Sequence, residues 1–142
     1  MATRPDIPDE LYSIFVIAPS DQPRPIKVAC SFWPVDYLSA TKSQEARQLV
    51  IHSLFWVTDR KLAVHIAKRC RHIFKKAGKD PLGGWFDVTG EWAVKVIVFA
   101  ANDAGIRLYN EAEARAMKTA FLAEIGELVG AGMCLTKWKK SV

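Results

Sequence analysis

The residues of this sequence that could do chemistry are mainly basic, and they gather in one stretch. Eight cationic residues lie between positions 60 and 79: Arg60, Lys61, Lys68, Arg69, Arg71, Lys75, Lys76 and Lys79. A cluster of this kind suits a polyanion, because neutralising phosphates releases condensed counterions. A solvated helix face would have the same composition, so that alternative stays open. We expect nucleic acid binding, with DNA favoured as the partner, through Lys68, Arg69, Arg71, Lys75 and Lys76.

Histidine and cysteine offer less chemistry. His65 and His72 are seven residues apart, which places them two turns apart on a helix, and no third ligand is evident. We therefore expect surface histidines and no metal site. The three cysteines, Cys30, Cys70 and Cys134, form no C-x-x-C pair. We expect them to be reduced and mostly buried, because free cysteine is among the most buried residue types.

Length and composition predict one packed domain. The chain has 142 residues, of which 50% are hydrophobic, and a formal net charge of +5. A chain of this size buries roughly 70% of its extended surface in a single core. No apolar run approaches the roughly 20 residues that span a bilayer, and the first residues lack the apolar stretch of a signal peptide. We expect a cytoplasmic protein without membrane contacts or a cofactor.

Three strands and a short helix are predicted in the first half of the chain. Residues 11–17 form a buried strand, residues 19–25 a proline-rich turn, and residues 26–30 a second strand that pairs antiparallel with the first. A helix is expected from about Pro34 to Ala46. The third strand spans residues 48–57, where Leu49, Ile51, Phe55 and Val57 recur at period two and are predicted to share one face.

Three further helices are predicted after the third strand. The first spans residues 59–77 with Thr58 as its cap; its apolar positions recur at helical spacing, which leaves the basic residues on the opposite side. Thr89 is expected to cap the second, which runs to about Ala104. Asn110 and Glu113 resemble a capping box that opens the third, which ends near Gly130.

The order of these elements predicts an α+β fold with a small three-stranded mixed or antiparallel sheet flanked by helices. We expect a single domain over residues 1–142, with the core in residues 11–89, appended helices in residues 90–130 and a basic tail in residues 131–142. Trp85 and Phe86 are predicted to fill the core. Trp33 is the aromatic residue that we most expect to be exposed.

Three blocks with their spacing resemble the GIY-YIG nuclease superfamily, in particular its short phage-associated branch. The first is the strand at residues 11–17, the second is Ile26-Lys27-Val28-Ala29-Cys30-Ser31-Phe32-Trp33-Pro34, and the third runs from Asp59 to Phe86. The resemblance covers residues 11–89. It implies a GIY-YIG-like fold and, at the retained Lys27, a contact with a phosphate backbone.

The positions that carry catalysis in that family are altered in this chain. Ser13 and Phe15 stand where the family has two tyrosines, Tyr37 stands at the arginine position, and Ala67 stands where a glutamate holds the metal. The histidine position corresponds to Arg71. In such nucleases a tyrosine helps to activate water, an arginine stabilises phosphate charge and a carboxylate holds Mg²⁺. The resemblance therefore implies a nuclease fold without confident catalytic residues.

Two other functions stay open beside a catalytically inactive nucleic-acid-binding module. The first is a divergent Mg²⁺-dependent endonuclease that recruits Tyr12 and Tyr37, with Asp36 or Glu91 as a carboxylate. The second is a protein-interaction or inhibitor module. Its partner, or a second copy of the chain, would dock on the apolar side of the helix at residues 111–129.

Overall fold

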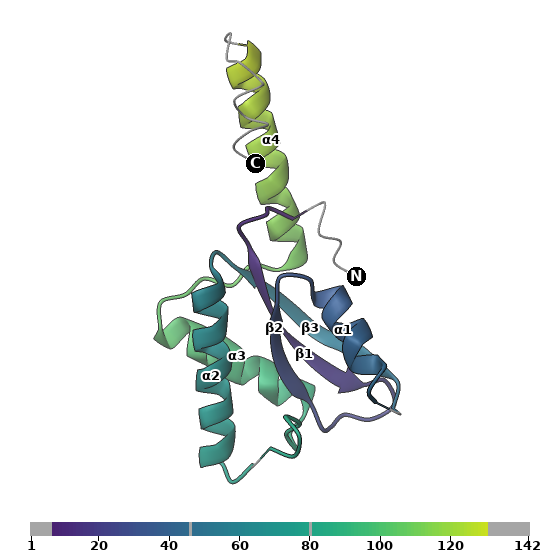
Figure 1. Ribbon diagram of the computed structural model, residues 1–142. Helices are drawn as coiled ribbons and strands as arrows, with labels where there is room; N and C mark the ends of the chain where they lie inside the picture. Colours follow the sequence, from purple (N-terminus) through teal and green to yellow (C-terminus); the bar gives the residue numbers. More distant parts are fainter. Residues whose placement is uncertain (1–6, 46, 80, 131–142) are drawn as a thin grey trace.

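The computed structural model describes residues 7–45, 47–79 and 81–130, with only the backbone for residues 129 and 130. Its sheet contains β1 (Tyr12–Pro19), β2 (Lys27–Ser31) and β3 (Leu49–Val57). β1 lies in the centre and pairs antiparallel with both neighbours, in the order β2-β1-β3 (Figure 1). The predicted α+β class and the antiparallel pairing of the first two strands are confirmed.

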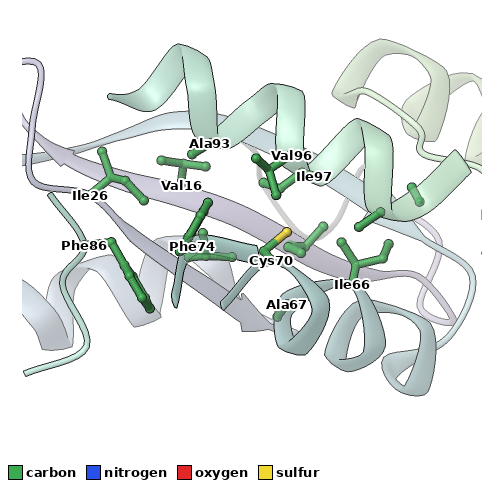
Figure 2. Packing of buried hydrophobic residues seen from close by; sticks show 14 of the residues in the cluster. Val16, Ile26, Ile66, Ala67, Cys70, Phe74, Phe86, Ala93, Val96 and Ile97 are labelled. Atoms are coloured by element: carbon green, nitrogen blue, oxygen red, sulfur yellow. The ribbon is translucent and has the colours of Figure 1, made fainter. Parts of the chain in front are cut away.

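Helices cover both faces of the sheet. α1 (Pro34–Lys42) packs against the face that carries Phe15 and Ala29. α2 (Arg60–Lys76) and α3 (Gly90–Asp103) pack against the opposite face, where the main core forms (Figure 2). Because β1 is covered on both faces, every β1 residue after Tyr12 is buried and its sequence is almost entirely apolar.

A β-bulge in β3 overturns the prediction that its apolar residues share one face. Ser53 lies opposite Val16 and Ile51 lies opposite Ile17, so His52 is an extra residue between two regular pairs. An extra residue inverts the alternation of side chains along the strand. As a result, Leu49 and Ile51 pack on the α1 face, whereas Phe55 and Val57 pack on the α2 and α3 face.

The helix caps agree with the sequence in two of three cases. Thr89 accepts the amide hydrogen of Trp92 at 3.2 Å. The capping box is also present: Asn110 accepts from the Glu113 amide at 2.8 Å, and Glu113 accepts from the Asn110 amide at 3.0 Å. For α2 the prediction of Thr58 is wrong. Asp59 is the cap and accepts from the Lys61 amide at 3.0 Å.

The two C-terminal helices have different relations to the core. α3 contributes Ala93, Val96 and Ile97 to the main core, so it is part of the core and not an addition to it. α4 (Glu111–Gly130) contacts the body through its first turns, where Ala114 is buried beside Trp56. The rest of α4 extends away from the sheet (Figure 1). The predicted basic tail at 131–142 and Cys134 lie outside the described residues.

None of the helices in the described part of the chain is both long and apolar enough to cross a bilayer.

Candidate nucleic-acid interface

α2 is strongly amphipathic, and its cations therefore lie on the side that faces away from the core. Its inward side consists of Ala63, Ile66, Ala67, Cys70 and Phe74, which are all buried against the sheet and α3 (Figure 2). The opposite side must therefore face solvent. Five exposed cations lie there, and we call them the α2 basic surface: Arg60, Lys61, Lys68, Lys75 and Lys76.

Some of the predicted nucleic-acid-binding residues of α2 already bind protein groups, and others do not. Arg69 forms an ion pair with Asp103 of α3 at 3.3 Å. Arg71 donates from Nη2 to the carbonyl oxygen of Val28 at 3.2 Å. By contrast, no cation of the α2 basic surface is ion-paired within the described part of the chain. The unpaired charges are therefore on the α2 basic surface, while Arg69 and Arg71 also join α2 to its neighbours.

The first half of this surface is hollowed. A shallow, open depression of about 470 Å³ is lined by Arg60, Lys61, Val64, His65 and Lys68. Its residues come from two successive turns of α2, and three of them are cations. A depression with this lining offers several donors to an anionic group without an acidic side chain in the lining.

Lys27 does not lie on this surface. It pairs with Ile17 in the sheet register, so its side chain shares the α1 face with Ile17 and Ala29. Its Nζ lies 5.7 Å from the centroid of the Tyr37 ring. The predicted nucleic-acid-binding residues therefore lie on both sides of the sheet, with Lys27 on one face and the α2 cations on the other.

The positions that the resemblance aligns with the catalytic residues of GIY-YIG nucleases also lie on different faces of the sheet. Phe15 is buried and contacts Tyr37 edge to face, with ring centroids 5.5 Å apart. Ser13 is buried on the same face as Phe15 and donates to the Ser31 carbonyl at 2.5 Å. Ala67 lies on the buried side of α2, which covers the other face. The structure brings Ser13, Phe15 and Tyr37 to one face and Ala67 to the other.

The residues of the endonuclease alternative are similarly dispersed. Tyr12 packs against the core on the α2 and α3 face, whereas Tyr37 packs on the α1 face. Asp36 is exposed in the first turn of α1. Glu91 is exposed in the first turn of α3, where its Oε1 lies 3.7 Å from Nε2 of His52. These groups therefore do not face a common point from which they could act on one phosphate.

Two of the cysteines lie where α2 meets the sheet, Cys70 on α2 and Cys30 on β2. Cys70 is fully buried, and Cys30 is half-buried with its Sγ 3.4 Å from the carbonyl oxygen of Ala63. Burial raises the pKa of Cys30 to about 11 and that of Cys70 to about 12, although the nearby Arg71 acts in the opposite direction. Both groups are therefore neutral thiols at physiological pH, as expected for structural cysteines.

An aromatic cluster of Tyr12, Phe32 and Trp33 lies at the end of β2. Phe32 contacts Trp33 with ring centroids 5.5 Å apart and contacts Tyr12 with centroids 6.2 Å apart. Trp33 is 47% exposed, in agreement with its prediction as an exposed aromatic residue. The contact between Phe32 and Tyr12 was not predicted, because it depends on the pairing of β1 with β2. The sequence feature that could have indicated this cluster is the pair of adjacent aromatic residues, Phe32 and Trp33, directly before Pro34.

Trp85 and Phe86 were both predicted to fill the core. Phe86 does so and is buried against Phe74, with ring centroids 4.8 Å apart. Trp85 is half-buried beside the α1-side core, with the guanidinium of Arg47 4.7 Å from its ring centroid. Both residues follow a tight turn at Gly83 and Gly84, which have φ values of 59° and 87°. Such positive φ values favour glycine over other residues.

Comparison of the chain with protein-family models, curated proteins and solved structures finds no match. The resemblance to GIY-YIG nucleases therefore stays a prediction.

Proposed function

We propose that this protein is a non-catalytic nucleic-acid-binding module that holds a phosphate backbone on the α2 basic surface. The observation that carries the proposal is that the five cations of this surface are exposed on one side of a helix whose other side is buried. Because the helix is packed into the core, its cations keep a stable spacing. Such an arrangement binds phosphates without a large ordering cost in the backbone.

The free charge of the surface supports the proposal further. A cation that is already paired with a carboxylate gains less from a phosphate than an unpaired one does. Lys68, Lys75 and Lys76 have no ion-pair partner among the described residues. DNA is the favoured partner. The proposal includes no cutting step, because Ser13, Phe15 and Ala67 cannot supply the family's water activation or metal binding.

The test is a titration of duplex and single-stranded DNA at several salt concentrations, with and without Mg²⁺. The wild-type protein should bind, with log K falling linearly against log salt. The combined variant Lys68→Ala, Lys75→Ala, Lys76→Ala should reduce this slope by about three, or one for each lysine. Its control is Arg115→Ala, which removes one cation of α4 that is ion-paired with Glu111 and should leave the slope unchanged.

Three results would decide against the proposal. No binding at low salt would refute it outright. A slope that changes as much for each removed charge in Arg115→Ala as in the α2 variant would show a general charge effect and no defined surface. Mg²⁺-dependent cleavage that is lost in Tyr37→Phe would favour the endonuclease instead.

A further inference from the structure

Trp33 is an aromatic side chain held partly exposed by its surroundings. Its amide donates to Oγ of Ser31 at 3.0 Å, and the buried Pro34 follows it as the first residue of α1. Phe32 supports its ring edge to face and in turn packs on Tyr12. The backbone is thus fixed on both sides of Trp33 and the ring rests on other aromatic rings. A half-exposed tryptophan in this setting is a pre-organised flat surface.

The aromatic cluster and the depression on α2 lie at the same end of the sheet. Tyr12 pairs with Val57, which precedes Arg60 by three residues. Cys30, two residues before Phe32, contacts the carbonyl of Ala63 in the first turn of α2. Figure 1 shows the β2–α1 connection and the start of α2 together at this end. The aromatic cluster therefore lies at the same end of the sheet as the first turn of α2, where Arg60 and Lys61 begin the α2 basic surface.

We infer that the preferred ligand is single-stranded nucleic acid, with its backbone on the α2 basic surface and an unpaired base stacked on Trp33. This inference rests on the proposed function and adds the class of ligand to it. Bases in a duplex already stack on each other, so their faces are closed to a protein ring. An unpaired base has an open face, and cation-lined surfaces with aromatic platforms are the usual means of binding it.

The experiment compares a thymidine homopolymer, a uridine homopolymer and a duplex of equal length. The wild-type protein should bind at least one of the homopolymers more tightly than the duplex, and the two homopolymers tell DNA from RNA. Trp33→Ala should weaken binding to the single strand about tenfold and leave duplex binding unchanged. Trp33→Phe keeps an aromatic face and should retain most of the affinity. Phe99→Ala removes an exposed aromatic residue from α3 and serves as the control.

A second measurement does not depend on the folding of the alanine variant. Single-stranded ligand should quench tryptophan fluorescence in the wild-type protein, and Trp33→Phe should lose part of this quenching while it still binds. Salt-dependent binding through α2 with equal affinity for single strand and duplex would overturn this inference alone. So would quenching that is unchanged in Trp33→Phe. Absence of all binding would overturn the proposed function together with it.

Discussion

The guanidinium of Arg71 on α2 donates a hydrogen bond to the carbonyl oxygen of Val28 on β2, with a distance of 3.2 Å between Nη2 and the oxygen. β2 is an edge strand, and Val28 points its backbone groups away from β1, as Ile26 does where it pairs with Phe86. Arg71 therefore satisfies an acceptor on the open edge of the sheet. It also connects the polar side of α2 to that edge, because it bridges the two elements.

Loss of this hydrogen bond should destabilise the fold. We expect Arg71→Ala to lower the free energy of unfolding by about 1–2 kcal/mol, since the donor is charged but the acceptor lies at an accessible edge. Lys75→Ala removes the same charge from an exposed position of α2 and should change stability by less than about 0.5 kcal/mol. Urea unfolding of both variants measures the difference. Equal stabilities would show that the Arg71 hydrogen bond contributes nothing.

A side chain at Gly90 would meet the ring of His52. A Cβ on Gly90 would lie 2.6 Å from Cδ2 and Nε2 of His52. We expect Gly90→Ala to destabilise the protein by about 1–3 kcal/mol, the cost of overpacking. In a His52→Ala background the same change should stabilise by up to about 1 kcal/mol, because alanine favours a helix. Thermal unfolding of the four proteins completes the cycle, and additive effects would contradict the steric explanation.

The buried thiols should make stability fall at alkaline pH. Burial raises the pKa of Cys30 from 9.0 to about 11 and the pKa of Cys70 from 9.0 to about 12. Above pH 9.0 the unfolded chain releases these protons while the folded protein retains them, so the thiol contribution is complete below pH 9.0. It is lost as the pH rises to about 11 for Cys30 and to about 12 for Cys70. The loss should approach about 1 kcal/mol per pH unit for each thiol.

Urea unfolding between neutral and alkaline pH checks this expectation. Cys70→Ala should show a shallower fall in stability with pH than the wild-type protein, whatever its stability at neutral pH. Native Cys70 should also react with an alkylating reagent much more slowly than in urea, as followed by peptide mass mapping. A pH dependence that is identical in wild type and Cys70→Ala would show that the thiol does not titrate as expected.

Much of the local structure could be predicted from the sequence, because helices and caps depend on residues within about one turn of each other. The apolar side of α2 is an example, since its period of 3.6 identified the buried residues and therefore the exposed cations. The N-cap of α2 shows the limit of prediction from the sequence. Thr58 and Asp59 are both residue types that cap helices, and in the structure Asp59 takes the extended backbone conformation of a cap, with φ −155° and ψ 143°.

The amino-acid sequence by itself determined the three strands, the amphipathic α2 and the position of its positive charge. Each of these features depends on the pattern of apolar and polar residues close together in the chain. Tertiary structure decided which charges are unpaired. Arg69 forms an ion pair with Asp103, and this pair could not be predicted because the two residues are far apart in the sequence. It also decided that Lys27 lies across the sheet from α2, and that the bulge at His52 divides β3 between two faces. These outcomes depend on strand register and helix packing, which are set by contacts between residues far apart in the chain.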